Sequence, residues 1–523
     1  MPSSAKPVTI APWDEHNQKL VANVHPADWV NPPPALRYDL VVIGAGTAGL
    51  VTAAGAAGLG AKVALVEKHF LGGDCLNVGC VPSKCLHRAT RAMADIRRAG
   101  EFGVRVFGEP EIDFKTVMER LRRIRADVSQ HDSAKRFRDL GVDVFLGEAR
   151  FIAPGMIETG GAVMRFKKAV IATGARAAVP AVEGLNETGY LTNETVFSLT
   201  QCPRRLAVIG GGPIGCELAQ AFRRFGCEVI LFHKNAHLLD REDSDAAEVI
   251  QTAFIREGVR LKLNSTSKRV SLSDAGKIIE CETNGKSESV VVDEILLAVG
   301  RAPNVEGLGL DAAGVEFDSR LGVKVNDRLQ TTNPRIYTAG DVCMKWKFTH
   351  AADAAARIVV QNALFLGRKK LNSLTVPWCT YTDPEVAHVG LSAQEAKKRG
   401  IELDSFSTPL NKVDRAIVDG ATEGFAKVHV RKGTDRIIGA TVVAEHAGEM
   451  INELTLAMAG KLGLGALANV IHPYPTQAEA IKKTADAWNR ARLTPLVKRL
   501  FGIWLSRKIV RRTIERNCTS NHI

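Results

Sequence analysis

Two regions of this chain show the same order of apolar residues. In each region a short apolar run is followed by a stretch rich in small residues and then by a second apolar run. Residues 40–43 read Leu-Val-Val-Ile, an unbroken and largely β-branched run that is typical of a buried strand. A stretch rich in alanine and glycine follows and predicts a helix that packs closely on a sheet. A second apolar run at 62–66 completes the unit, and the same order returns over 206–233. The pattern predicts two strand–turn–helix–strand units and an α/β fold.

A glycine-rich turn joins the first strand to the helix in both units. The first turn reads Gly44-x-Gly46-x-x-Gly49, and the second reads Gly210-x-Gly212-x-x-Gly215. One such motif is weak evidence, but two in the same strand–turn–helix–strand context are strong evidence for dinucleotide binding. The glycines let the backbone approach a pyrophosphate at a helix N-terminus, where free N–H groups and the helix dipole favour negative charge.

The residue that follows the second strand differs between the two units. Glu67 lies 23 residues after Gly44, and His233 lies 23 residues after Gly210. A carboxylate at this place suits a ribose 2′-hydroxyl, whereas an imidazole followed by Lys234 tolerates a 2′-phosphate. The sequence therefore predicts FAD in the first site and NADPH in the second. NADH stays open as an alternative, in which His233 is a surface residue at the end of a strand.

Other segments complete the outline. The charge-free run at 40–60 has the length of a membrane span, but its glycines and its strand-like first half favour the nucleotide unit instead. Residues 85–140 are rich in arginine and show apolar residues at helical spacing, which predicts an amphipathic helical pair on the first domain. From about residue 375 strands and helices are predicted to alternate, which indicates a separate C-terminal domain.

Two cysteines, Cys75 and Cys80, lie in the glycine-rich run 72–84, which starts five residues after Glu67. The spacing alone is more typical of inert buried thiols. A turn or helix N-terminus depresses a thiolate pKa, and the glycine and proline context supplies one. The whole run, including Val-Pro-Ser-Lys at 81–84, resembles the redox-active disulfide of the flavin-dependent pyridine nucleotide-disulfide oxidoreductases. These enzymes include glutathione reductase, dihydrolipoamide dehydrogenase and mercuric reductase.

The resemblance covers about residues 38–490 and implies two Rossmann-like FAD/NAD(P)-binding domains, a C-terminal α/β dimerisation domain and a homodimer. It implies that Cys75 is the interchange thiol facing the substrate and that Cys80 is the thiolate against the flavin. It pairs Lys84 with Glu217 beside the flavin; the alternative is an exposed glutamate and a capping lysine. A carboxylate on this apolar helix needs a partner, since its burial is otherwise costly. Cofactor contacts are also expected at Gly174, Gly300, Gly340 and Asp341.

Two positions depart from the family pattern. Disulfide reductases of this family place a histidine directly before Pro-Thr and a glutamate five residues later, as an acid–base pair for the dithiol. Here Glu479 is present, but Tyr474 occupies the histidine position and His472 lies two residues earlier. Mercuric reductases also carry a tyrosine there, and a phenol is a poor base near neutral pH. Pro213 stands where many relatives have a tyrosine that gates nicotinamide access, so that gate is in doubt.

The domain prediction combines these segments. The predicted domains are an N-terminal extension at 1–37, a first FAD-binding part with the cysteine pair at 38–190, an NAD(P)-binding domain at 191–314, a second FAD-binding part at 315–372, a dimerisation domain at 373–488 and a basic amphipathic tail at 489–523. The polar N-terminus lacks the apolar segment of a signal peptide. The tail predicts a helix that either rests on an anionic membrane or packs on its own domain or the dimer partner.

Cysteine content and net charge limit the cellular setting and the binding partners of this protein. Ten cysteines in 523 residues are too sparse for a secreted disulfide scaffold and favour a reducing, cytoplasmic setting. Cys85 is expected to be structural, and a single Cys518 stands near the end, where mercuric reductases carry a Cys-Cys pair. The formal charge of +12 is ascribed to attraction of anionic substrates, because no nucleic-acid-binding motif appears.

The sequence therefore predicts a mercuric reductase-like flavoenzyme. It would bind Hg(II) or another thiophilic ion transiently through Cys75 and Cys80. The alternatives are reduction of a disulfide or quinone, a dihydrolipoamide dehydrogenase-like activity, and a flavin-bound redox sensor without turnover.

Overall fold

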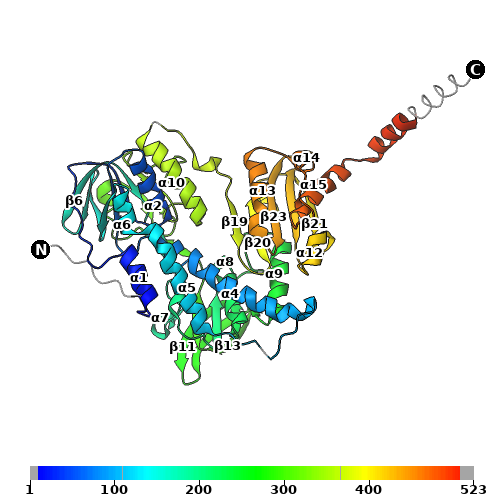
Figure 1. Cartoon of the computed structure of the whole chain (residues 1–523), viewed down its shortest axis with the longest axis horizontal. Helices are drawn as coiled ribbons and strands as arrows, with labels where there is room; N and C mark the ends of the chain where they lie inside the picture. Colours follow the sequence, from blue (N-terminus) through cyan, green and yellow to red (C-terminus); the bar gives the residue numbers. More distant parts are fainter. Residues whose placement is uncertain (1–9, 109, 366, 507–523) are drawn as a thin grey trace, which may run out of the picture. The chain divides into compact units, whose positions relative to one another are not determined.

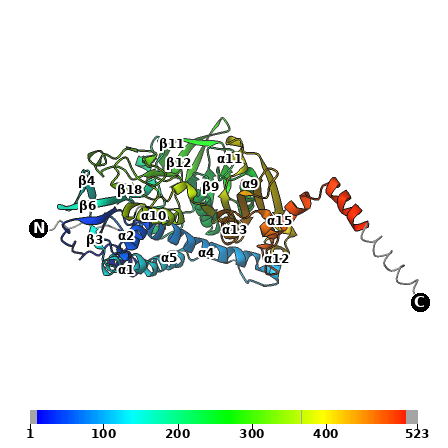
Figure 2. The same ribbon diagram turned by 90° about the horizontal axis from the view of Figure 1, so that it is seen from above.

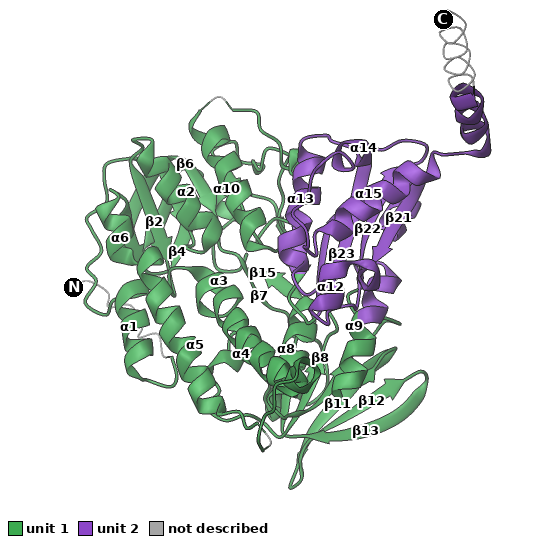
Figure 3. Cartoon of the chain, turned by 45° about the vertical axis from the view of Figure 1, so that its right-hand side comes forward, with its two compact units in different colours: residues 1–240, 250–374, 380–383 green, residues 241–249, 375–379, 384–523 purple. Residues whose placement is uncertain are grey.

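The computed structural model describes residues 10–108, 110–365 and 367–506 of the chain. It divides into two compact units (Figure 3). The first unit comprises residues 1–240, 250–374 and 380–383, and the second comprises residues 241–249, 375–379 and 384–523. The sequence predictions for residues 507–523, including the one for Cys518, fall outside the described residues.

The first unit contains a seven-stranded sheet with the order β3-β2-β1-β6-β5-β4, in which β18 also pairs with β6. Strands β1, β2, β3, β6 and β18 run parallel, and β1 is fully paired on both sides, with Leu40 beside Val63 and Lys168. The apolar run at 40–43 is buried here, as predicted. The strands are β1 Tyr38–Ile43, β2 Val63–Glu67, β3 Asp143–Leu146, β4 Ala149–Ala153, β5 Met156–Thr159, β6 Ala162–Ile171 and β18 Ile336–Thr338.

Helices cover this sheet. The small residues of α2 (Thr47–Gly58) let it pack against α10 (Thr349–Leu364), and Figures 1 and 2 show the two side by side. The predicted helical pair is formed by α4 (Cys80–Arg98) and α5 (Phe114–Val128), which pack on each other. The remaining helices of this region are α1 Glu15–Val24, α3 Gly73–Asn77 and α6 Ala134–Asp139.

A buried arginine ties α3 to its neighbours. Arg125 of α5 donates to the Asn77 carbonyl (2.8 Å) and to the Asn17 side chain (2.7 Å). A buried guanidinium costs free energy unless its N–H groups have acceptors, so these bonds fix the end of α3 firmly. Asn77 lies two residues after Cys75, and the cysteine segment is therefore held from behind.

The first unit contains a second parallel sheet, with the order β10-β9-β8-β14 and with helix α8 between β8 and β9. Its elements are β8 Arg205–Ile209, α8 Pro213–Arg224, β9 Glu228–Phe232, β10 Arg260–Lys262 and β14 Glu294–Leu297. Antiparallel strands flank it: β7 Ala175–Ala177 with β15 Arg301–Pro303, β11 Ser265–Ser273 with β12 Gly276–Thr283 and β13 Lys286–Val292, and β16 Phe317–Asp318 with β17 Gly322–Val323. Helix α7 spans Leu185–Thr188. The first unit thus contains the strand–turn–helix–strand pattern in two copies, as predicted.

The second unit is built on a five-stranded sheet with the order β19-β20-β23-β22-β21. Helix α13 packs on β20 and β23, and α15 packs on β21 and β22. The strands are β19 Pro377–Thr380, β20 Glu385–Gly390, β21 Leu403–Pro409, β22 Phe425–Arg431 and β23 Ile437–Ala444, and the helices are α11 Ala393–Lys398, α12 Asp414–Val418, α13 Ala447–Ala459, α14 Leu464–Leu467 and α15 Glu479–Ala491. Helix α9 spans Ser244–Glu257, and only its residues 244–249 belong to this unit.

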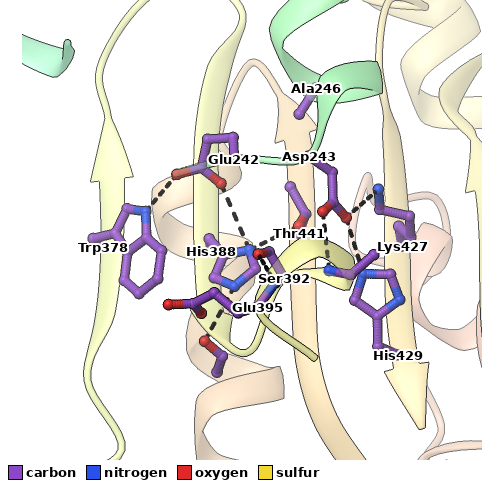
Figure 4. A network of polar contacts seen from close by, with 12 residues as sticks. Glu242, Asp243, Ala246, Trp378, His388, Ser392, Glu395, Lys427, His429 and Thr441 are labelled. Carbon is purple, nitrogen blue, oxygen red and sulfur yellow. Dashed lines mark hydrogen bonds and ion pairs between the residues drawn. The ribbon is translucent and has the colours of Figure 1, made fainter. Parts of the chain in front are cut away.

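A buried polar network holds residues 242–243 on this second sheet (Figure 4). Asp243 contacts Lys427 (2.7 Å) and His429 (3.0 Å), and these bonds hold the pKa of Asp243 below its usual range against the cost of burial. Glu242 instead has the Trp378 indole N–H as donor, and burial raises its pKa to about 7. Asp243 has direct bonds to His429 and to the Lys427 ammonium, whereas at Glu242 burial and the neighbouring Asp243 charge outweigh the more weakly acting cations, which explains the opposite shifts.

The predicted tail helix covers residues 495–506 of the described chain. Its apolar side chains are exposed, including Leu496, Phe501 and Trp504. Among the described residues, no helix has both the length and the apolar character needed to cross a membrane, and the charge-free run at 40–60 forms β1, a turn and α2.

Candidate active site

The two cysteines of the 72–84 run face each other across a tight turn. Cys75 lies within α3, Cys80 is the first residue of α4, and both are free thiols. A Cβ on Gly79 would lie 2.7 Å from the Asp74 carbonyl oxygen, so only glycine allows the turn that joins the two helices. The turn therefore brings Cys75 and Cys80 together, as the sequence predicted.

The pair is electrostatically asymmetric. The hydrogen bond from Cys75 lowers the pKa of Cys80 to about 6, and Thr349 and the charge of Lys84 act in the same direction against burial. The Thr349 hydroxyl lies 3.4 Å from the Cys80 sulfur. The same contact with Cys80, together with burial, raises the pKa of Cys75. Cys80 is thus a thiolate near neutral pH, and its place at the start of the 19-residue helix α4 favours this charge.

A lysine–glutamate pair lies behind the thiols. Lys84 of α4 donates to Glu217 of α8 at 2.9 Å, and His87 lies 3.1 Å from the same carboxylate oxygen. The backbone N–H of Tyr381 donates to the other oxygen of Glu217 (2.9 Å). Burial would raise the pKa of Glu217, but Lys84 and His87 lower it to about 2. Glu217 is therefore a buried, fully partnered carboxylate, and the alternative of an exposed helical glutamate is excluded.

The first glycine-rich turn is closed by Glu67. Its Oε2 accepts the Ala45 N–H (2.6 Å) and its Oε1 accepts the His69 N–H (2.8 Å). Gly44 has φ +97°, and a Cβ there would lie 2.4 Å from the Ala172 carbonyl oxygen. Helix α2 begins after Gly46 without a side-chain cap, so its first N–H groups remain available to an anion.

The second turn repeats this geometry with a histidine. The Gly211 N–H donates to His233 Nδ1 (3.1 Å), and His233 Nε2 lies 3.0 Å from Asp240. His233 is buried, so it is not the surface residue of the alternative, and both ring nitrogens have partners within the protein. Of the two predicted phosphate-tolerant residues, Lys234 is the exposed one. A Cβ on Gly212 would meet no atom within 4 Å, which leaves space for a ligand at the α8 N-terminus.

The segment that contains Asp341 lies beside the first turn. A Cβ on Gly340 would lie 3.3 Å from the Ala48 side chain of α2. Arg301 donates to Asp74, and its Nε lies 3.4 Å from Asp341. Burial raises the pKa of Asp341, and Arg301 opposes the shift. Nearby, Gly174 accepts the Asn304 N–H (3.0 Å) with φ +67°, and Gly300 has φ +119°. The strands that follow these two glycines, β7 and β15, pair with each other.

In the second unit, Tyr474 and Glu479 have different partners. The Tyr474 hydroxyl donates to Asp414 (2.9 Å), and that carboxylate raises the pKa of Tyr474. Glu479 lies 3.4 Å from Lys483. His472 Nε2 lies 2.9 Å from Glu453. The phenol at the histidine position is therefore ionised near neutral pH even less than a free tyrosine, so less phenolate is present to accept a proton.

Comparison with known proteins places these residues in a family. The model of the family described as "Pyridine nucleotide-disulphide oxidoreductase" matches residues 38–356, and the model of its dimerisation domain matches residues 376–485. The chain belongs to the pyridine nucleotide-disulphide oxidoreductases. Members of this family depend on FAD and NAD(P)H.

Named relatives fall into more than one activity. A mercuric reductase of Staphylococcus aureus is 37% identical over 87% of this chain and 83% of the relative. A dihydrolipoyl dehydrogenase of Thermus scotoductus is 35% identical over 87% of this chain and 98% of the relative. Among solved structures, the HOCl-induced flavoprotein disulfide reductase RclA of Escherichia coli matches with a TM-score of 0.76 and 28% identity, over 86% of this chain and 99% of that chain.

The residues of this pyridine nucleotide-disulphide oxidoreductase fit FAD. The uncapped start of α2 would receive the pyrophosphate, Glu67 lies at the end of β2, and Asp341 lies close to the same helix. A Cβ on Gly49 would lie 1.8 Å from the Gly44 carbonyl oxygen, so helix and turn approach as closely as a dinucleotide fold requires. The uncapped start of α8 fits the nicotinamide nucleotide in the same way.

Sequence reasoning missed four residues of this oxidoreductase site. His87 had a usable signal, because it lies one helical turn after Lys84 and shares its face. Arg301 directly follows Gly300, and the sequence pattern indicated only the glycine. Thr349 and Tyr381 reach the site from distant elements, and the fold alone brings them there.

Proposed function

We propose that this oxidoreductase uses NADPH, FAD and the Cys75–Cys80 pair to reduce Hg(II) or another thiophilic metal ion. The observation that carries the proposal is Tyr474 at the position of the dithiol base, with its hydroxyl bonded to Asp414. Because this carboxylate raises the pKa of the phenol, Tyr474 is unsuited to accept a thiol proton near neutral pH.

A metal substrate removes the need for that base. Soft cations select thiolate sulfur, and a thiol bound to such a cation loses its proton outright. Cys80 is a thiolate near neutral pH, and metal binding would deprotonate Cys75 despite its raised pKa. A disulfide substrate, in contrast, requires a proton for each departing thiolate. The base therefore matters more for the disulfide than for the ion.

The chemistry balances with the family cofactors. Bound FAD would relay an electron pair from the nicotinamide to the protein disulfide. Reduction of the pair converts NADPH, one proton and the Cys75–Cys80 disulfide to NADP⁺ and the dithiol. With the metal, NADPH and Hg(II) yield NADP⁺, Hg(0) and one proton. Lys84 and Glu217 would keep a fixed charge beside the electron path, since Glu217 stays ionised even when buried.

The second candidate function is reduction of a disulfide, such as lipoamide, or of a quinone. The dihydrolipoyl dehydrogenase and flavoprotein disulfide reductase among the relatives favour this alternative. A flavin-bound redox sensor would have the same thiols and would lack steady turnover. An acceptor screen that follows NADPH oxidation separates all three.

The screen compares Hg(II), presented as a thiol complex, with oxidised glutathione and lipoamide. We expect Hg(II) to stimulate NADPH oxidation most. Tyr474→His should raise disulfide turnover and lower metal turnover, and Tyr474→Phe is the control for loss of the hydroxyl alone. A wild-type kcat/KM of about 10⁶ M⁻¹s⁻¹ for a simple disulfide lies in the normal enzyme range and would refute the metal assignment.

The thiol roles have their own spectroscopic test. Cys80→Ser should abolish the long-wavelength charge-transfer absorbance of the reduced holoprotein. Cys75→Ser should show that absorbance without reduction at pH 7, because a serine hydroxyl can replace the Cys75 thiol as donor, and Thr349 and Lys84 also lower the pKa of Cys80. A Cys75→Ser protein without the band at pH 7 would reverse the assignment.

The dimerisation domain supports a homodimer in which the Tyr474 segment of one subunit reaches the partner's Cys75. Mixing Cys75→Ser with Tyr474→Phe subunits tests this arrangement. Activity above that of either parent is expected after subunit exchange, and no gain would contradict a shared site.

The tail suggests one further contact for the proposed cytoplasmic enzyme. Helix 495–506 exposes Leu500 and Phe501 beside Lys498 and Arg499, which is the composition of a helix that lies on an anionic membrane surface. Sedimentation with anionic vesicles but not with neutral vesicles is expected. Equal recovery with both, or with neither, would remove this proposal.

A further inference from the structure

Glu217 has one side-chain partner more than the lysine–glutamate pair requires. Lys84 Nζ and His87 Nε2 contact the same oxygen, Oε2, at 2.9 Å and 3.1 Å. The side chains of His87 and Glu217 are 15% and 9% exposed, so water screens this contact weakly. The Tyr381 N–H occupies Oε1. The carboxylate is thus divided among three donors, and the proposed mechanism uses only one of them.

The spacing of Lys84 and His87 along α4 explains why both side chains contact the same carboxylate. Lys84 and His87 are three residues apart on α4 and therefore lie on one face of the helix. Both reach across to α8, where Glu217 is buried. The Lys84 ammonium is also 4.2 Å from the centre of the Tyr381 ring, an attractive cation–π distance. Lys84 is consequently held at a fixed place between Glu217 and the ring.

We propose that His87 is a positioning residue, which donates to Glu217 and thereby leaves more of the Lys84 charge to act on the flavin and on Cys80. The inference rests on the proposed function, because it assumes a flavin beside this pair. His87 does not touch the reacting atoms. It acts through the carboxylate that it shares with Lys84.

The direction of the effect follows from the charges. Lys84 lowers the pKa of Cys80 and Glu217 raises it. An N–H donor on Glu217 offsets part of its negative charge, so Lys84 dominates. Without that donor the carboxylate would neutralise Lys84 more completely. The net positive field would fall, the thiol would be harder to ionise, and a reduced flavin, which carries negative charge near this pair, would be less stable.

Three variants of the holoprotein separate the hydrogen bond from other effects. His87→Leu removes the donor, His87→Gln keeps an N–H group at a similar reach, and Arg88→Gln is the control. Arg88 is exposed on the same helix, so its replacement removes a full charge without touching Glu217. His87→Met is a second apolar variant if His87→Leu does not fold.

Two quantities are measured in each variant, and neither requires an acceptor substrate. The first is the flavin midpoint potential against a reference dye. The second is the pH midpoint of the charge-transfer absorbance in the dithiol form. We expect His87→Leu to shift the flavin equilibrium about tenfold toward the oxidised form, which is about 30 mV for a two-electron couple. The thiol midpoint should rise in the same variant.

His87→Gln should stay within about twofold of the wild type in both measurements, because hydrogen bonds to charged groups carry the effect. Arg88→Gln should do the same. Unchanged values in His87→Leu would overturn the proposal, and so would equal shifts in His87→Leu and His87→Gln. Failure of the proposed function is recognised separately. It appears as a wild-type protein that binds no flavin or turns over no acceptor.

Discussion

The two glycine-rich turns of the first unit share a backbone, and two of the side-chain differences between them bear on how each would hold a dinucleotide. In both, the first glycine accepts no Cβ, because Ala172 or Ala298 places a carbonyl oxygen 2.4 or 2.3 Å from that position. In both, the next N–H donates to the residue 23 positions after that glycine. This acceptor is Glu67 in the first turn and His233 in the second.

The second difference lies at the start of the helix. Thr47 opens α2 with an N–H and a hydroxyl, whereas Pro213 opens α8 with neither. Pro213 preorganises the helix, but it removes one donor from the anion site. The same backbone therefore offers a dinucleotide more hydrogen bonds at the first turn than at the second. This difference suits a flavin that stays bound and a nicotinamide nucleotide that must leave after each turnover.

The largest effect is expected from the third glycine of each turn. A Cβ on Gly49 would lie 1.8 Å from the Gly44 carbonyl oxygen, and a Cβ on Gly215 would lie 1.8 Å from that of Gly210. Gly49→Ala should yield protein without flavin absorbance. Gly215→Ala should remain yellow and lose reduction by NADPH, measured by stopped-flow bleaching. A Gly215→Ala protein that bleaches normally would show that the second turn does not bind the nucleotide.

Exchange of the helix-opening residues should have the next largest effect. Pro213→Thr restores a donor, and hydrogen bonds to charged groups are worth about 1.5–3 kcal/mol. We expect NADPH to bind about tenfold more tightly and product release to slow, measured by fluorescence titration and kcat. Thr47→Pro should weaken flavin retention on dilution. Ile214→Ala changes α8 without adding a donor and is the control; equal tightening in both α8 variants would contradict the donor argument.

Nucleotide preference tests the acceptor positions. Lys234 is exposed beside the second turn, and its loss should reduce the preference for NADPH about tenfold, since charge-assisted contacts to a phosphate are strong. In the double variant His233→Glu, Lys234→Ala, the new carboxylate should accept the Gly211 N–H as Glu67 accepts that of Ala45. We expect this variant to prefer NADH. Equal kcat/KM values for NADPH and NADH in the wild type would refute the prediction.

The sequence predicted the strands and turns of the two nucleotide units better than it predicted the contacts of their side chains. Apolar runs and glycine spacing located both units, because buried parallel strands and tight turns leave strong local signals. The predicted strand at 206–209 became β8 Arg205–Ile209. Residue type alone assigned His233 to a phosphate, but its ring nitrogens bind Gly211 and Asp240. The direction of a side chain depends on neighbours that sequence spacing does not reveal.

The catalytic region shows the same limit. Cys75, Cys80, Lys84 and Glu217 were named from motifs, and the structure brings each pair together. Tyr474 and Glu479 were named in the same way, and each has a different partner. Asp414 lies 60 residues before Tyr474, and no local pattern links them. Contacts between elements far apart in the sequence could therefore not be predicted from local patterns.

The smallest effect is expected from Asp240, which contacts His233 at the second turn. Because Gly211 donates to His233 Nδ1, the ring N–H must lie on Nε2 and donate to Asp240. Burial would raise the pKa of Asp240, but its bonds to His233 and Asn235 hold it below the usual value of 3.8. A carboxyl with a depressed folded-state pKa stabilises the fold above its unfolded pKa, and this stability is lost as pH falls through the folded value.

Asp240→Asn keeps an acceptor for the ring and removes the charge. Asp240 is 42% exposed, so solvent screening limits the loss to at most about 1 kcal/mol, or about 1–2 °C in Tm for a chain of this size. The difference in Tm from wild type should be present at pH 7 and shrink as pH falls below about 4. NADPH affinity should rise about twofold, because the proposed site of the 2′-phosphate would lose a nearby negative charge. A Tm difference that grows on acidification would show that Asp240 is not ionised in the fold, and the second turn would then be held by the ring alone.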